Sequence, residues 1–111
     1  MQSMVRGGPE PALLVVDREG IVRAISPGHV HWLGPRRHRL LGHPWWGVVH
    51  RTDLKWALHH MRRVWEGTGE PQVWQVRVRT GAGRWCRVQM TAMLQDDGLV
   101  RLLLRPVQLG T

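Results

Sequence analysis

The pattern of apolar and polar residues begins with two short β-rich segments. The apolar run at residues 12–16 and the alternating segment at residues 21–25 flank a polar turn at residues 17–20, which predicts a β-hairpin. Prolines follow at Pro35 and Pro44, and because proline interrupts helices, only short helical pieces fit around them. A region of short helices is therefore expected after the hairpin.

Residues 54–66 form the best predicted helix of the chain. Thr52 or Asp53 can cap its start, and the segment 67–71, which contains glycine and proline, ends it. Apolar residues at helical spacing form one stripe, which should face the core: Leu54, Ala57, Leu58, Met61, Val64 and Trp65.

After this helix the pattern changes to a period of two, which is typical of strands with one buried face. Alternation over residues 74–79, 85–94 and 100–105, interrupted by turns at residues 81–83 and 95–98, predicts three strands joined by hairpins. Two strands, several short helices, one longer helix and three strands make an α+β fold, with the helices on one face of an antiparallel sheet.

Several short motifs follow one another in order along the chain. They are residues 14–22 (LVVDREGIV), Trp32-Leu33-Gly34 followed by residues 40–44 (LLGHP), residues 49–53 (VHRTD), and Glu66-Gly67 followed by residues 75–85 (QVRVRTGAGRW). Over residues 12–106 this series resembles the motifs of the PAS domain family. The resemblance implies a five-stranded antiparallel sheet covered on one face, between a lead-in or cap at residues 1–11 and a tail at residues 107–111.

The resemblance also implies a function. It implies a sensory or protein-interaction domain of a bacterial signalling protein, of the kind usually attached to a histidine kinase, a cyclic-dinucleotide enzyme or a transcriptional regulator. Such a domain acts by binding a small ligand or a partner and by rearranging a homodimer. An enzyme is not expected from the residues either, because the chain has no P-loop, dinucleotide fingerprint or nucleophile elbow.

The predicted ligand pocket lies between the helices and the sheet. Its proposed residues are Trp32, Trp46, Met61, Trp74 and Val76. Trp45 and Trp65 are expected to face the same space. Filling the core is the alternative role of these tryptophans, because the chain has seven Trp but no Phe or Tyr.

The sequence does not identify a cofactor, and a domain without a cofactor is favoured. Members of the family hold haem, flavin, a small metabolite or nothing. Flavin is disfavoured because the one cysteine, Cys86, falls on a predicted strand, and no zinc or other metal site is expected. A haem-binding gas or redox sensor is an alternative, with His60 as the candidate ligand ahead of His59, because a helical wheel turns His59 toward water and places His60 at the flank of the apolar stripe. His43 and His50 are further candidates.

Apolar side chains also fall on the face of the predicted sheet that lies away from the helices. They are Leu13, Val15, Trp85, Leu99 and Leu103. A monomer would expose them as a hydrophobic patch, so these residues are the predicted interface of a homodimer. Capping of the patch by the N-terminal segment is the alternative.

The charge raises a different class of function. Sixteen Lys and Arg residues against eight Asp and Glu residues give a net charge of +8, which makes a basic nucleic-acid-binding module an alternative. The arginines are nevertheless spread along the chain, and no recognition-helix or RNA-binding motif accompanies them. Nucleic acid is therefore disfavoured as a partner.

Length and cysteine content indicate the number of domains and the cellular location of the protein. The 111 residues suffice for one domain with a modest core. A single cysteine cannot form an internal disulfide, no apolar run reaches the roughly 20 residues of a membrane span, and no signal peptide is recognisable. We therefore expect a cytoplasmic protein without membrane insertion.

Overall fold

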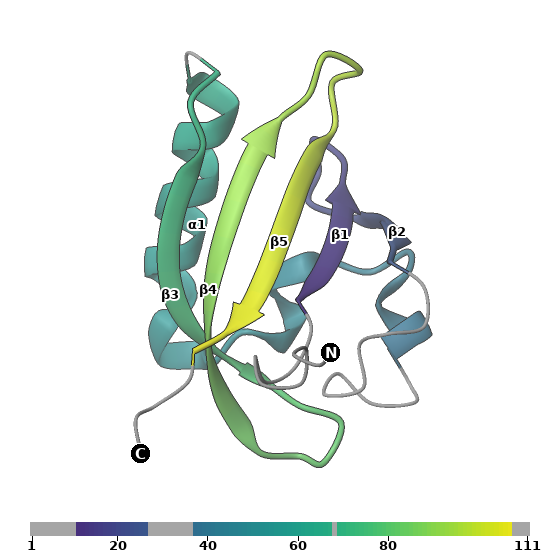
Figure 1. Cartoon of the computed structure of the whole chain (residues 1–111), viewed down its shortest axis with the longest axis vertical. Coiled ribbons are helices and arrows are strands. Elements are labelled where there is room, and N and C mark those ends of the chain that lie inside the picture. The colour runs from purple at the N-terminus through teal and green to yellow at the C-terminus, as the bar shows by residue number, and fades with distance from the viewer. Residues whose placement is uncertain (1–10, 27–36, 68, 108–111) are drawn as a thin grey trace, which may run out of the picture.

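The computed structural model describes residues 11–26, 37–67 and 69–107, which form one antiparallel sheet with a helix on one face (Figure 1). The strands are β1 (Ala12–Val16), β2 (Val22–Ile25), β3 (Gln72–Arg79), β4 (Trp85–Leu94) and β5 (Val100–Pro106). Their order in the sheet is β2-β1-β5-β4-β3, so the strands from the two ends of the chain meet in the middle. The predicted five-stranded α+β fold is confirmed.

The helix α1 (Arg51–Glu66) packs against β3 and β4. Ala57, Met61 and Val64 are its buried residues, whereas Leu58, at the margin of the predicted stripe, is 39% exposed. The predicted start of the helix was wrong by three residues. Neither Thr52 nor Asp53 is the cap; His50 is, because its Nδ1 accepts a hydrogen bond of 3.1 Å from the backbone N–H of Thr52.

Short connections fix the start of α1 against the edge strand β3. Val49 forms an isolated antiparallel bridge with Val78, and the backbone N–H of His50 donates to the carbonyl of Arg77 at 2.8 Å. Asp53 then accepts hydrogen bonds from the side chain and the backbone N–H of Arg77. The hydrogen bonds from the Arg77 side chain hold the pKa of the Asp53 carboxyl below its ordinary value, against the opposing effect of partial burial.

Two 3-10 helices, η3 (Arg37–Leu40) and η4 (Trp45–Val48), lie between β2 and α1 in the described part of the chain. The turn between β1 and β2 supports η4, because the backbone N–H of Trp45 donates to the carbonyl of Gly20 at 2.9 Å. Gly20 has a φ of +88°, and a Cβ at this position would collide with the ring of Trp46. Glycine is therefore required here by both backbone conformation and space.

The core lies between α1, η4 and the inner face of the sheet. The strands contribute to it at every second residue, as the period of two predicts: Ala12, Leu14, Val16, Trp74, Val76, Val78, Val88, Met90, Ala92, Val100, Leu102 and Leu104. Residues on the opposite face of the same strands are half-buried or exposed. The core of the described residues thus lies on the inner face of the sheet, and the outer face carries the half-buried and exposed positions.

Candidate functional site

Three of the five predicted pocket residues lie together in the core beneath α1. Met61 on the helix and Trp74 and Val76 on β3 are each no more than 4% exposed. Trp46 is only partly buried and rests against Gly20, at the β1–β2 end of the same core. Trp32 lies outside the described residues.

The aromatic rings in this region form a continuous series from the surface into the core. Trp56 meets His60 edge to face at 4.3 Å between ring centroids, and His60 stacks on Trp74 at 5.3 Å with an interplanar angle of 6°. Trp74 then contacts Trp45 at 6.4 Å, and Trp45 contacts Trp46 at 6.0 Å. The series places His60 between a half-exposed indole and a buried one.

Trp45, and not its neighbour Trp46, is the deeper of the adjacent pair, with 1% of its surface exposed. The sequence placed both indoles in this space but could not order them by depth. In a 3-10 helix of four residues, successive side chains point in different directions, and the contacts of η4 with the sheet decide which one is buried.

Among the residues that the structure describes, two polar atoms of this stack are buried without a hydrogen-bond partner. They are Nε2 of His60 and Nε1 of Trp74. The other ring nitrogen of His60, Nδ1, lies 3.4 Å from Oε1 of Gln72, an acceptor that favours a proton on Nδ1 and leaves Nε2 as an acceptor. The stack therefore presents one free donor, the Trp74 N–H, and one free acceptor, His60 Nε2. A hydroxyl group or a water molecule complements both.

A hollow of about 280 Å³ opens at the end of α1, next to this stack. It is lined by Arg63, Glu66, Gly67, Glu70 and Gln72. Gln72 connects the two features, because its side chain lines the hollow and also contacts His60.

The two candidate haem ligands occupy different environments. His59 is exposed, as the helical wheel predicted, and cannot reach the core. His60 is half-buried, but Trp56 and Trp74 already crowd its ring. A haem bound through His60 would have to displace one of these indoles, so the residues present do not fit a macrocycle. His43 is exposed and His50 serves as the helix cap.

The residues that the structure describes do not favour a metal site or a reactive thiol. No cluster of three or more His, Cys, Asp or Glu residues that could hold a metal ion occurs among them. Cys86 is half-buried on the inner side of β4, and this burial raises the pKa of its thiol, which disfavours the reactive thiolate.

Leu13 and Leu103, two of the predicted interface residues, lie side by side on the outer face of the sheet. The pairing register extends their row across four strands, from Leu13 through Leu103 and Thr91 to Val73. Val15 lies in the neighbouring row, in which Arg101 separates it from Met93.

The sequence analysis missed two members of this face. Val73 is 53% exposed and Met93 is 39% exposed, which makes them its most exposed apolar side chains apart from Trp85. The period of two could have found both, because each alternates with a buried neighbour, Trp74 or Ala92. Leu99 precedes β5 and is half-buried.

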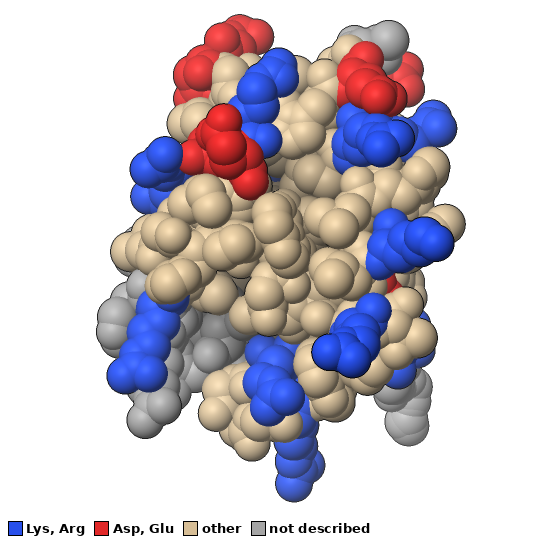
Figure 2. Space-filling model, turned by 180° about the vertical axis from the view of Figure 1, so that it is seen from behind, with Lys and Arg blue, Asp and Glu red and all other residues tan. Residues whose placement is uncertain are grey.

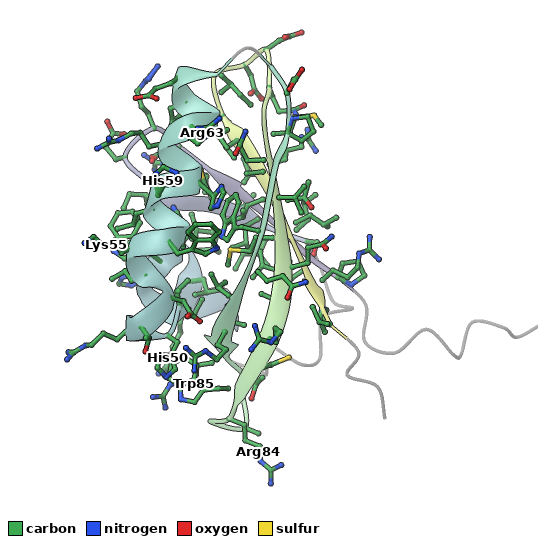
Figure 3. The ribbon with its side chains drawn as sticks, turned by 90° about the vertical axis from the view of Figure 1, so that its left-hand side faces the viewer. His50, Lys55, His59, Arg63, Arg84 and Trp85 are labelled. Carbon is green, nitrogen blue, oxygen red and sulfur yellow. The ribbon has the colours of Figure 1, made fainter. Side chains whose placement is uncertain are left out.

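Trp85 is not part of this row. It starts β4, six residues before Thr91, and is therefore about 20 Å away along the strand. Its ring lies 4.5 Å from that of His50, and the guanidinium of Arg79 lies 5.0 Å from its centroid (Figure 3). Trp85 belongs to the surface around the start of α1.

Comparison with known proteins agrees with this geometry. The family model described as "PAS fold" matches residues 9–105. A domain of a sensory box sensor histidine kinase/response regulator from Geobacter sulfurreducens is 25% identical, with a TM-score of 0.71 over 86% of this chain and 82% of that chain.

More distant structures share the fold. The PAS-B domain of Drosophila melanogaster Cycle with bound ethylene glycol is 14% identical, with a TM-score of 0.68 over 86% of this chain and 97% of that chain. The N-terminal domain of a diguanylate cyclase with PAS/PAC sensor from Marinobacter aquaeolei is 15% identical, with a TM-score of 0.53 over 85% of this chain and 93% of that chain. A search among curated proteins found no match. In the described ranges, no helix combines the length and the apolar character needed to cross a membrane.

Proposed function

The chain belongs to the PAS fold family, and on that premise we propose that it is the sensory domain of a bacterial signal-transduction protein, acting by binding and not by catalysis. The likeness to a domain of a sensor histidine kinase supports this assignment. The effector that it serves would be a histidine kinase or a cyclic-dinucleotide enzyme, and the expected location is the cytoplasm.

The observation that carries the sensory role is the pair of unpartnered polar atoms in the core, His60 Nε2 and Trp74 Nε1. Leaving a buried polar atom without a hydrogen bond costs about 1–3 kcal/mol, so a protein gains stability when a ligand or a water molecule satisfies it. Met61 and Val76 provide apolar surroundings in the same part of the core. A small molecule with a hydroxyl group and a short apolar part fits this combination.

The second part of the proposal is a homodimer formed through the outer face of the sheet. Leu13, Leu103 and Val73 lie in one row there, with Val15 and Met93 in the next. Pairing of two such faces would remove their exposed apolar surface from water. Arg101 interrupts the second row, so its aliphatic part would have to pack while its charge remains hydrated.

The ligand site and the dimer face share a strand. Trp74 points into the core, and its neighbour Val73 points to the outer face of the same strand, β3. A ligand that moves the backbone at Trp74 would therefore also move Val73. If two dimer arrangements differ in this position, the ligand changes their populations by its difference in affinity for the two.

Two measurements, each made with and without a small diol, test this function: sedimentation equilibrium for dimerisation and thermal denaturation for the melting temperature. We expect the protein to dimerise, 1,2-propanediol or ethylene glycol to raise the melting temperature, and the dimerisation constant to change with diol concentration. Trp74→Phe should abolish the diol effect on melting, because it removes the donor. Two results together would contradict the proposal. The protein would stay monomeric at high concentration, and diols would raise its melting temperature no more than they raise that of Trp74→Phe.

A further inference from the structure

The exposed side of α1 is a ridge of basic side chains. Lys55, His59 and Arg63 follow one another at steps of four residues, and each is exposed (Figure 3). Four residues of helix rise about 6 Å, so these groups are regularly spaced along the axis. Arg51 and Arg62 are also exposed, and on the helical wheel both lie on the side of Lys55 away from His59 and Arg63.

The carboxylates of α1 leave most of this ridge unneutralised. Asp53 is engaged by Arg77, and Glu66 lies beside Arg63 at the end of the helix, where both line the hollow without forming an ion pair. Among the residues that the structure describes, the only ion pairs are Arg77–Asp53 and Arg23–Asp17, neither of which involves the ridge. Figure 2 shows most visible Asp and Glu side chains at one end of the molecule, beside some of the basic side chains, while Lys and Arg side chains continue without them to the other end.

A half-exposed indole lies beside these charges. Trp56 is 53% exposed, and its ring stacks on that of His59 at 6.2 Å with an interplanar angle of 21°. The exposed part of this ring offers a planar apolar surface beside the cations of α1. Its other neighbour, His60, leads into the core, so the position of the Trp56 ring is fixed from beneath.

The β3–β4 hairpin continues the ridge. His50, Trp85 and Arg84 follow from the start of α1 to the tip of this hairpin (Figure 3). Trp85 is 43% exposed and carries the guanidinium of Arg79 against its ring. We call the whole surface the basic stripe. Its members are Arg51, Lys55, Trp56, His59, Arg62, Arg63, Arg79, Arg84 and Trp85.

We propose that the basic stripe binds single-stranded nucleic acid, with phosphates against the cations of α1 and bases stacked on Trp56 and Trp85. Sites for single strands combine a positive surface that follows the backbone with aromatic side chains on which bases stack. The scattered arginines disfavoured this partner at the level of the sequence. The fold gathers basic residues from α1 and the hairpin into one surface and adds two exposed indoles.

The same observations favour a single strand over other anionic partners. A duplex keeps its bases stacked on one another, so the two exposed indoles would find no free base face on it. An acidic peptide would satisfy the charges but offers carboxylates, not planar rings, to the indoles.

Fluorescence anisotropy of a labelled dT15 oligonucleotide tests the proposal with the whole chain. We expect saturable binding at 50 mM salt that weakens steeply at 200 mM salt, with weaker binding of a 15-base-pair duplex and of poly-glutamate with the same number of charges. Lys55→Ala combined with Arg63→Ala should reduce the dependence of log K on log salt by about 1.4, or about 0.7 for each lost phosphate contact on a single strand.

The matched control removes two charges from the outer face of the sheet, Arg87→Ala combined with Arg105→Ala, both of which are exposed. It should bind dT15 nearly as well as the unchanged protein. Trp56→Ala should weaken binding about ten-fold, as the loss of one stacked base does, and Trp56→Phe should restore most of it.

Three results would overturn the proposal: no binding of dT15 at 50 mM salt, equal losses in the two double variants, or poly-glutamate binding as tightly as dT15. The last would identify the stripe as a surface for an acidic protein segment. None of them bears on the sensory function, which is tested by diols and by dimerisation, so the two proposals fail separately.

Discussion

Asp53 and Arg77 join the first turn of α1 to the edge strand β3 through a two-point contact. Nε of Arg77 donates to Oδ2 of Asp53 at 2.9 Å, and Nη2 donates to Oδ1 at 2.9 Å. The backbone N–H of Arg77 donates to Oδ2 as well, at 2.9 Å. One carboxylate therefore accepts hydrogen bonds both from the Arg77 side chain and from the backbone at the edge of the sheet. Because the basic stripe and the aromatic stack include residues of α1, this contact also fixes their position relative to the sheet.

Asp53→Asn should lower the thermal stability of the protein at neutral pH by about 4 °C or more, because it removes the charge that Arg77 binds. The pKa of Asp53 is depressed in the folded state. Its contribution is therefore complete above the pKa of the unfolded chain, and it is lost as the pH falls through the lower, folded-state pKa. The difference in melting temperature between the two proteins should shrink in acid below about pH 4.

Asp96→Asn is the control for this measurement, since Asp96 is exposed in the turn between β4 and β5. Its melting temperature should follow that of the unchanged protein at every pH. If the melting temperature of Asp53→Asn stayed below that of the unchanged protein by the same amount down to pH 2, the charge of Asp53 would not be the cause of the difference.

Gly20→Ala should destabilise the protein more than Gly83→Ala does. Both glycines have similar positive φ values, +88° and +84°, so both substitutions carry backbone strain of roughly 1–2 kcal/mol. At Gly83 the new methyl group meets open space, whereas at Gly20 it meets the ring of Trp46. Overpacking adds about 1–3 kcal/mol at Gly20. Urea denaturation measures both, and equal losses would mean that Trp46 moves aside freely.

Trp74→Phe should be less destabilising than Trp45→Phe in the absence of ligand. Both substitutions remove similar buried volume, but only Trp74 also loses a buried N–H that lacks a partner. The gain from removing that group is about 1–3 kcal/mol, which sets the expected difference between the two free energies of unfolding. A larger loss for Trp74→Phe would indicate that a water molecule or a ligand already satisfies this nitrogen.

Val73→Lys should dissociate the proposed homodimer, and Gln75→Lys should not. Both positions are exposed on the outer side of β3 and both substitutions add one positive charge. Val73, however, lies in the row with Leu103 and Leu13, where a buried ammonium group would have no partner. Sedimentation velocity over a range of protein concentrations distinguishes the two, and equal dimerisation of both variants would place the interface elsewhere.

Local patterns in the sequence predicted the elements and their buried faces. The period of two assigned Val88, Met90 and Ala92 to the core, and all three are buried. The helical wheel turned His59 to solvent and His60 to the flank of α1, as the structure has them. These predictions depend only on the geometry of one element, since residues that share a face recur at a fixed interval within it.

Other features were decided by contacts between elements. The sequence alone does not say that β5 lies between β1 and β4, that Trp45 is buried deeper than Trp46, or that α1 begins at Arg51 under a His50 cap. It also does not reveal that Trp85 leaves the outer face to join the basic stripe. The strand order, the depth of Trp45 and the position of Trp85 depend on residues far apart in the chain, whose approach is set by the packing of the whole fold. The His50 cap is a local contact with Thr52, but no hydrophobic period encodes it, and bonds from Val49 and His50 to β3 hold it in place.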